Sequence, residues 1–239
     1  MLECSAPIAQ GISSIWHQFQ NIKEEYFELR EVKRENLILK KRLESLQAKE
    51  ISYQELLLAN QRLEKLLSFK KKLTFPTLGA RVISYAPNFS PRIIFLDRGK
   101  KDGVNLYYPV VNFQGIVGQV VSLSPHYAKV LLIIDPNSRV EVMSQRTRVH
   151  GILKGTGINL AEVIYVPNTE DIKEGDIFIT SGLDGIFPKG ILVGKVINVF
   201  TSRGEIFKKI ILKTSVDFRR LEEVLILLKP PVLPYGKRN

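Results

Sequence analysis

Residues 22–46 read IKEEYFELREVKRENLILKKRLESL and contain neither glycine nor proline, the two residues least compatible with a helix interior. When Ile22 is taken as position a of a heptad, mostly apolar side chains return at the a and d positions. This seam consists of Ile22, Leu29, Val32, Asn36, Leu39, Leu43 and Leu46. The spacing predicts a long helix with the narrow apolar stripe of a coiled coil.

The helix extends in both directions, because no glycine or proline occurs between Ile12 and Phe75. Near Glu50 the repeat falters, as at a local break in a coiled coil. Downstream residues fit a seam shifted by one position: Leu56, Ala59, Leu63 and Leu66. Because so long a helix is not stable alone on so narrow a stripe, we expect residues 1–75 to form a dimerisation helix.

Polar residues near this seam favour a parallel dimer. Asn36 occupies an a position, where a buried amide pairs with its twin across a two-stranded parallel coil. In the same arrangement the g positions Glu28 and Glu35 face the e positions Lys33 and Lys40 of the partner helix. The alternative is a helix that packs on the chain's own β domains, with these charges solvated.

After Phe75, glycine and proline recur every few residues between short apolar runs. Strands of this length, separated by such turns, are typical of sandwiches and barrels. We therefore predict a mainly β fold in which the N-terminal coiled-coil helix precedes two small barrels of the six-stranded type. The predicted strands are 79–85, 92–96, 108–113, 115–123, 129–134, 139–143, 151–153, 161–166, 176–181, 190–200, 208–214 and 224–228.

An internal similarity supports two barrels rather than one. Residues 115–121 and 190–197 both carry paired glycines in an apolar strand, followed by a polar turn and a second strand. We expect a first barrel over 76–138 and a second over 139–229, with exchange of strands between them left open. Residues 230–239 are proline-rich and are predicted to be a flexible tail.

Few residues offer catalytic chemistry. His126 or His150, Asp135 or Asp171, and Ser181 occur in the chain order of a chymotrypsin-like serine hydrolase. However, Ser181 lies in a glycine-rich turn that explains it without catalysis. The sequence has no CxxC or HExxH motif and no clustered histidines, so we expect no metal site and no cofactor.

The net charge is +11, and most of the excess follows Phe75. Arg139, Arg146, Arg148 and Lys154 interleave with apolar residues and could form the basic stripe of a nucleic-acid-binding barrel. No clustered aromatic residues accompany them, which favours an ordinary polar outer face and no nucleic acid as partner. The single cysteine, Cys4, excludes an internal disulfide.

Several stretches, in order and closely spaced, resemble the MreC family of rod shape-determining proteins. They include Asp135–Val140, Gly151–Leu153 and Thr180–Ile191, and the resemblance covers about Val82 to Phe200. The most specific piece is Ser181–Gly190, which has the form Ser-Gly-Leu-x-Gly-x-Phe-Pro-Lys-Gly.

The resemblance implies two barrels, distantly protease-like in fold but without a working triad, in a periplasmic scaffold of the bacterial cell-wall elongation machinery. It implies self-association as dimers or filaments, and binding to the transpeptidase penicillin-binding protein 2, with MreD and the MreB system as further partners. The transmembrane helix of the family is absent from this chain. We therefore expect the parent protein to be anchored in the inner membrane by an N-terminal helix.

The residues that would carry this function are few. We expect the barrels to recognise partners through exposed strand edges and aromatic anchors. The candidate anchors are Phe89, Tyr107, Phe113 and Phe187. Glycines at turns and barrel corners are expected to have structural roles: Gly115, Gly118, Gly182, Gly185, Gly190 and Gly194.

Overall fold

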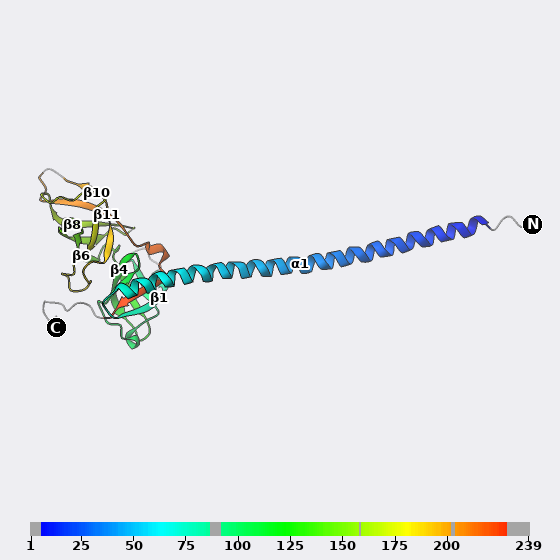
Figure 1. Ribbon diagram of the computed structural model, residues 1–239, viewed down its shortest axis with the longest axis horizontal. Coiled ribbons are helices and arrows are strands. Elements are labelled where there is room, and N and C mark those ends of the chain that lie inside the picture. The colour runs from blue at the N-terminus through cyan, green and yellow to red at the C-terminus, as the bar shows by residue number, and fades with distance from the viewer. Residues whose placement is uncertain (1–5, 87–91, 158, 202–203, 229–239) are drawn as a thin grey trace, which may run out of the picture. The chain divides into compact units, whose positions relative to one another are not determined.

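The computed structural model describes residues 6–86, 92–157, 159–201 and 204–228, and within the helix the side chains of Arg30 and of residues from Val32 onward. One long helix, α1 (Ala6–Lys72), precedes the strands of two closed barrels (Figure 1). The predicted fold class, mainly β with an N-terminal helix and two six-stranded barrels, is confirmed. Phe89 and the predicted tail 230–239 lie outside the described residues.

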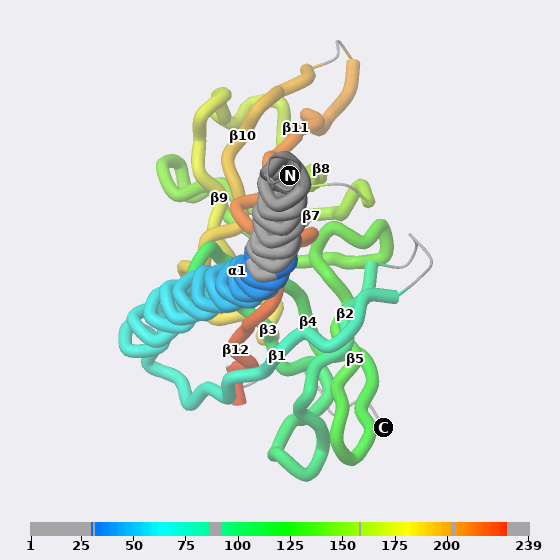
Figure 2. Tube along the Cα trace, turned by 90° about the vertical axis from the view of Figure 1, so that its right-hand side faces the viewer, coloured from blue at the N-terminus to red at the C-terminus, as the bar shows by residue number. Residues whose placement is uncertain are grey.

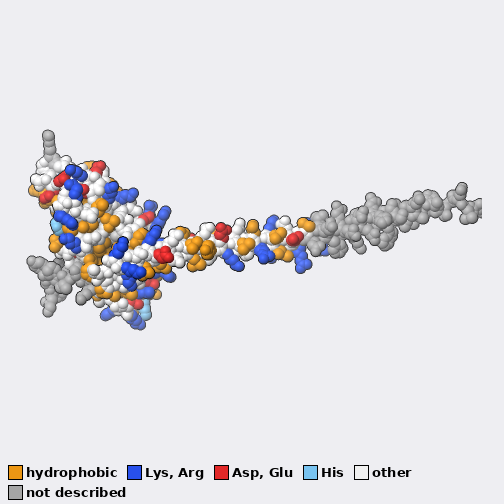
Figure 3. Space-filling model, viewed as in Figure 1, with side chains coloured by type: hydrophobic (Ala, Val, Ile, Leu, Met, Phe, Trp, Pro, Cys, Tyr) orange, Lys and Arg blue, Asp and Glu red, His pale blue; other side chains and the backbone are white. Residues whose placement is uncertain are grey.

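Helix α1 is long because no helix-breaking residue follows Gly11 before its end. Lys70, Lys71 and Lys72 occupy its last turn, where positive charge stabilises the helix dipole. Apolar side chains recur along the described part of the helix (Figure 3). No helix in the described residues has an apolar run long enough to cross a membrane. The chain divides into two compact units, Met1–Asn60 and Gln61–Asn239.

The last turns of α1 belong to the second unit. Leu66 is only 7% exposed and lies in the barrel core, with Phe69 and Leu73 packed against it. Arg62 forms ion pairs with Glu222 at 2.5 Å and with Glu223 at 3.4 Å. The prediction that the coiled-coil seam continues through Leu66 is therefore wrong, because this side chain is buried within its own chain.

The first barrel has the strand order β1-β12-β3-β4-β5-β2 and closes on itself. Its strands are β1 (Thr77–Tyr85), β2 (Ile93–Leu96), β3 (Pro109–Asn112), β4 (Gly115–Leu123), β5 (Ala128–Leu132) and β12 (Glu223–Leu227). In β5 the burial alternates along the strand, so that Ala128, Val130 and Leu132 point into the core.

Strand β12 corrects the predicted boundary. It falls in the range 139–229 that we assigned to the second barrel, yet it pairs with β1 and β3 of the first (Figure 2). The chain therefore leaves the first barrel after β5, builds the second, and returns to close the first. The physical reason is closure: β1 and β3 would otherwise leave unpaired edges.

The second barrel has the order β10-β11-β8-β7-β6-β9. Its strands are β6 (Arg139–Ser144), β7 (His150–Gly155), β8 (Leu160–Pro167), β9 (Ile177–Thr180), β10 (Leu192–Phe200) and β11 (Phe207–Thr214). Each strand of the two described barrels has a neighbour on both sides. The expected exposed strand edges are therefore absent from these barrels, and recognition by strand addition is not available to them.

Strands β4 and β10 both require a glycine where the backbone of a neighbouring strand comes close. A Cβ on Gly118 of β4 would strike the Leu131 carbonyl oxygen, and one on Gly194 of β10 would strike that of Lys213. The strand register also shifts beside each glycine, as at a β-bulge. The absence of a side chain thus allows the neighbouring backbone to approach closely at equivalent places in both barrels.

The connection between the barrels is fixed by a buried carboxylate. Asp135 is fully buried, and it accepts hydrogen bonds from the backbone N–H groups of Arg92 at 2.7 Å and Asn137 at 2.8 Å. A Cβ on Gly155 would strike Ile134 and Asp135. Strand β7 therefore packs directly on this connection, which holds the second barrel against the first.

Candidate partner-binding surface

The Ser181–Gly190 loop is braced from inside by Thr180. The Thr180 hydroxyl donates to the Pro188 carbonyl at 2.5 Å and accepts from the Ile191 N–H at 3.0 Å. At the tip, Asp184 accepts from the N–H groups of Ile186 at 2.9 Å and Phe187 at 3.0 Å. These bonds give the loop one conformation and place Leu192, at the end of the segment that follows it, against Gly115 of the first barrel.

Phe187 is not the exposed anchor that we expected. Its side chain is only 1% exposed and belongs to the hydrophobic core. The loop folds back over the second barrel, and the large apolar side chain is buried because its exposure to water would be unfavourable. Phe187 therefore holds the loop in place.

Ser181 has a structural role in this loop. It is 4% exposed, and its hydroxyl accepts from the Leu183 N–H at 3.1 Å. The other candidate triad members have partners of their own. His126 contacts Lys101 and His150 contacts Glu141, while Asp135 accepts from backbone N–H groups and Asp171 binds Arg146. The described contacts thus bring none of the candidate histidines or aspartates to the Ser181 hydroxyl.

Arg146 is neutralised by two carboxylates. Its guanidinium binds both oxygens of Asp176, at 2.8 and 2.9 Å, and one of Asp171 at 2.7 Å. Hydrogen bonds from Arg146 are the largest cause that lowers the pKa of Asp171 and of Asp176 below their ordinary values. Arg139 donates to the backbone carbonyls of Pro136 and Ser138. These two arginines are therefore engaged within the fold, as expected for a polar outer face.

An exposed aromatic cluster lies at one end of the second barrel. The Tyr165 and Phe207 rings meet edge to face, with centroids 5.7 Å apart, and are 58% and 42% exposed. Ile206, just before β11, and Phe200 of β10 add apolar surface that is 75% and 50% exposed. We call Tyr165, Phe200, Ile206 and Phe207 the aromatic end. Clusters of exposed aromatic side chains are the usual anchors of protein interfaces.

A β-bulge directs Tyr165 outward. Lys208 pairs with Val166 and Ile210 with Val163, so two residues of β8 oppose a single residue of β11. Tyr165 has a φ of +64°, in the left-handed region that a bulky side chain rarely adopts. Strain of this kind persists only where the surrounding structure imposes it, and it often marks a functional position.

Cross-strand pairing joins Phe200 to the same face. Phe200 of β10 lies opposite Lys209 of β11, and Lys209 shares its face with Phe207 because side chains two apart lie on one side of a strand. Sequence reasoning missed all four residues of the aromatic end. A signal was available, because Val163–Val166 are all apolar, which interrupts the alternation expected of a regular strand.

The remaining predicted anchors lie on the first barrel. Tyr107 is 58% exposed and Phe113 is 40% exposed. The Lys65 ammonium lies 5.9 Å from the centre of the Phe113 ring, a cation–π contact with the end of α1. Both remain candidates for contact with a partner.

The predicted seam can be followed only in part. The apolar seam residues with described side chains are 57–62% exposed: Val32, Leu39, Leu43 and Leu46. Asn36 is also exposed, while the side chains of Ile22 and Leu29 lie outside the described part. The first unit therefore presents an uncovered apolar stripe along α1.

The chain was compared with families of known proteins. Residues 82–228 match the family described as "Rod shape-determining protein MreC, barrel core". The cell shape-determining protein MreC of Haemophilus influenzae is 30% identical over 86% of this chain and 59% of its own length. That of Caulobacter vibrioides is 32% identical over 68% of this chain and 46% of its own length. The chain thus spans about half the length of these relatives.

Solved structures give the same result. The chain is similar to MreC from Pseudomonas aeruginosa with a TM-score of 0.61 and 35% identity, covering 63% of this chain and 98% of that one. A periplasmic domain described as coming from the cell shape-determining filament MreC shares the fold, with a TM-score of 0.57 and 23% identity over 63% of this chain and 94% of that one. So does a chain from a complex between penicillin-binding protein 2 and MreC of Helicobacter pylori, with a TM-score of 0.50 and 21% identity over 64% of this chain and 99% of that one.

Proposed function

Because this chain belongs to the MreC family of rod shape-determining proteins, we propose that it is a non-catalytic scaffold in the periplasm for the bacterial cell-wall elongation machinery. It self-associates through α1 and binds a peptidoglycan synthase of the penicillin-binding protein 2 class through its second barrel. The parent protein is anchored in the inner membrane by an N-terminal helix. MreD and the MreB system are the further partners that the family resemblance implies.

The uncovered stripe of α1 supports self-association. Apolar side chains more than half exposed along one helix lose favourable burial energy unless another helix covers them. A second copy in register pairs Asn36 with its twin and places Glu35 opposite Lys40. The stripe therefore favours a parallel dimer over a single helix.

The aromatic end is the observation that carries the proposal of synthase binding. It combines four exposed apolar side chains with a tyrosine held at a positive φ. The Helicobacter pylori complex, in which a protein of this fold is paired with penicillin-binding protein 2, supports the choice of partner. Since the barrels are closed, such a partner has to be recognised through side chains.

The apolar stripe of α1 and the aromatic end act together. A dimer carries two copies of the aromatic end, and two tethered sites bind a paired or clustered synthase more tightly than one site does. No bond is made or broken by the scaffold. Its contribution is to hold the synthase in a fixed arrangement.

Fluorescence titration of labelled penicillin-binding protein 2 from the same bacterium tests the proposal. We expect Tyr165→Ser and Phe207→Ser each to weaken binding about tenfold or more, because truncation of a central aromatic anchor commonly costs about 2 kcal/mol. Tyr127→Ser is the matched control, since this tyrosine is 53% exposed but lies on the first barrel. Equal affinity for all three variants would refute the aromatic end as the synthase site, provided that their circular dichroism spectra match.

A further inference from the structure

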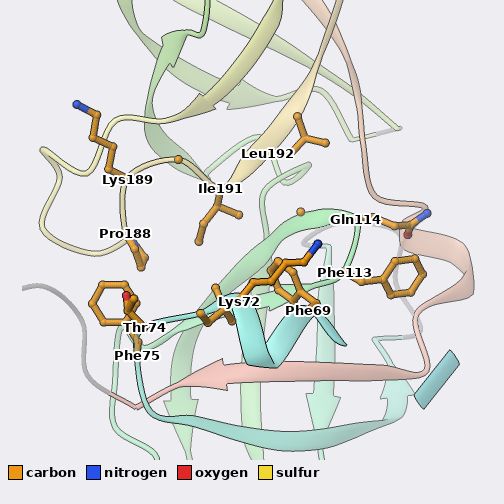
Figure 4. A pocket seen from close by; sticks show the side chains of 13 residues that line it. Phe69, Lys72, Thr74, Phe75, Phe113, Gln114, Pro188, Lys189, Ile191 and Leu192 are labelled. Atoms are coloured by element: carbon orange, nitrogen blue, oxygen red, sulfur yellow. The ribbon is translucent and has the colours of Figure 1, made fainter. Parts of the chain in front are cut away.

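A groove lies where the two barrels and the end of α1 meet. Its volume is about 380 Å³, within the range of sites that hold small ligands or a few side chains. All of its lining belongs to the second structural unit. The lining residues that an occupant would meet include Lys72, Phe75, Phe113, Pro188 and Ile191 (Figure 4).

The floor of the groove is a close contact between the barrels. A Cβ on Gly115 would strike the Leu192 carbonyl oxygen and would lie 2.6 Å from the Ser215 hydroxyl oxygen. One wall is the Pro188–Leu192 end of the loop that Thr180 braces. The groove is therefore built from backbone held in fixed positions, and an occupant would touch both barrels at once.

Apolar groups flank one positive charge in this groove. Figure 4 shows Phe75 beside Pro188 at one end and Phe113 at the other, with Lys72 and Ile191 between them. None of the described lining residues is acidic, and Lys72 forms no ion pair with any residue that the structure describes. The Lys189 ammonium turns away from the groove. The arrangement therefore offers apolar, cationic and apolar contacts in sequence.

We propose that this groove docks an extended peptide segment of a partner protein, in which a carboxylate lies between two large apolar side chains. In an extended peptide, side chains two residues apart lie on the same face, so the pattern apolar-x-acidic-x-apolar presents all three groups to the groove. The carboxylate pairs with Lys72, and the strongly basic chain, at +11, favours an acidic partner over a second copy of itself. This site is separate from the aromatic end.

Selection from a phage-displayed library of random heptapeptides on the whole chain tests the proposal. We expect enriched peptides to carry Asp or Glu between large apolar residues. The tightest peptide and its Gln or Asn counterpart are then labelled, and their affinities are measured by fluorescence anisotropy. Removal of the carboxylate should weaken binding about fivefold, as expected for a partly exposed ion pair.

Variants locate the binding site. Lys72→Gln should weaken binding of the acidic peptide about fivefold and abolish the preference of the groove for the acidic over the amide peptide. Lys71 is the neighbouring lysine outside the groove, so Lys71→Gln should change neither the affinity nor the preference. Phe113→Ala should weaken the binding of both peptides. Phe207→Ser should leave the binding of both unchanged, because this residue belongs to the synthase site and not to the groove.

Three results would overturn the proposal. The first is enrichment of peptides without carboxylates, and the second is equal behaviour of Lys72→Gln and Lys71→Gln. The third is displacement of the peptide by phosphatidylglycerol vesicles, or release of the bound peptide as the chain concentration rises, which would assign the groove to a lipid headgroup or to a second copy.

Discussion

Single residues in the Ser181–Gly190 loop show how backbone geometry constrains the sequence of this chain. Gly182 has a φ of +85° and Gly190 has a φ of +94°, both in the region that favours glycine. They differ in their surroundings: a Cβ on Gly182 would lie 3.1 Å from the Cβ of Lys189, whereas one on Gly190 would meet open space. An alanine at Gly190 therefore tests backbone strain alone, whereas an alanine at Gly182 adds a steric clash with Lys189.

We expect Gly190→Ala to lower the free energy of unfolding by about 1–2 kcal/mol, which is the cost of a Cβ in the left-handed region. Gly182→Ala should cost more, because the Lys189 backbone has to move as well. Urea denaturation of both variants measures the difference. Equal free energies of unfolding for Gly182→Ala and Gly190→Ala would contradict the close packing of Lys189 against this turn.

Arg146 makes stability depend on pH. It holds the pKa of Asp171 and of Asp176 below their ordinary values through direct hydrogen bonds. In the unfolded chain an aspartate titrates near pH 3.9, about its reference value, so between the two pKa values the unfolded state binds more protons. The stabilisation is therefore present above about pH 4 and is lost as the pH falls through the lower, folded-state pKa.

Thermal unfolding between pH 7 and pH 3 tests this consequence. The melting temperature of the native chain should fall on acidification, and Arg146→Gln should give a flatter dependence over the acidic range because its two aspartates titrate near their ordinary values. Arg148→Gln is a suitable control, since no described ion pair involves Arg148. Parallel pH curves for the native chain and Arg146→Gln would contradict the assignment.

Among the elements, α1 has two different environments along its length. Up to Asn60 it forms its own unit with an exposed stripe, and from Gln61 it belongs to the unit of the barrels, where Leu66 is buried. The apolar repeat alone did not separate these roles, because Leu63 and Leu66 continue a heptad pattern whether their partner is a second helix or a barrel.

Adjacent leucines give a direct test of this division. Leu66 is 7% exposed in the barrel core, whereas Leu67 is 53% exposed. Leu66→Ala should lower the free energy of unfolding by about 2–3 kcal/mol through lost burial and a residual cavity. Leu67→Ala should change it by less than about 0.5 kcal/mol. The two variants are compared by calorimetry. If they melted at the same temperature, Leu66 would not be packed in the barrel core.

The positions of the strands in the sequence were more predictable than the pairing of the strands in the barrels. All twelve predicted apolar runs became strands, because short β-rich segments between turn residues carry a local signal. The place of β12 in the first barrel had no such signal, since alternation specifies a strand but not its neighbour. Phe187 was mistaken for a surface residue for a similar reason, because the return of its loop over the core depends on hydrogen bonds to Thr180 and Asp184.

At the scale of the whole molecule, the proposed function requires several barrels to be brought together. In this proposal the helix supplies self-association and the barrels supply contact with the synthase, so a fragment without the coil separates the two contributions. A fragment that begins at Gln61 is the appropriate comparison. One that begins at Thr77 would remove Leu66, Phe69 and Leu73, which pack with the barrel core.

The affinity of surface-immobilised penicillin-binding protein 2 for the whole chain and for the Gln61–Asn239 fragment tests the central claim most directly. With the synthase immobilised at high density, the fragment should bind about 10²-fold more weakly than the whole chain, because it loses avidity but keeps the aromatic end. Light scattering on the same samples should give twice the chain mass for the whole chain and one chain mass for the fragment. Complete loss of binding by the fragment would place the contact on the helix, and equal affinity of the two would show that self-association adds nothing; either result would contradict the scaffold described here.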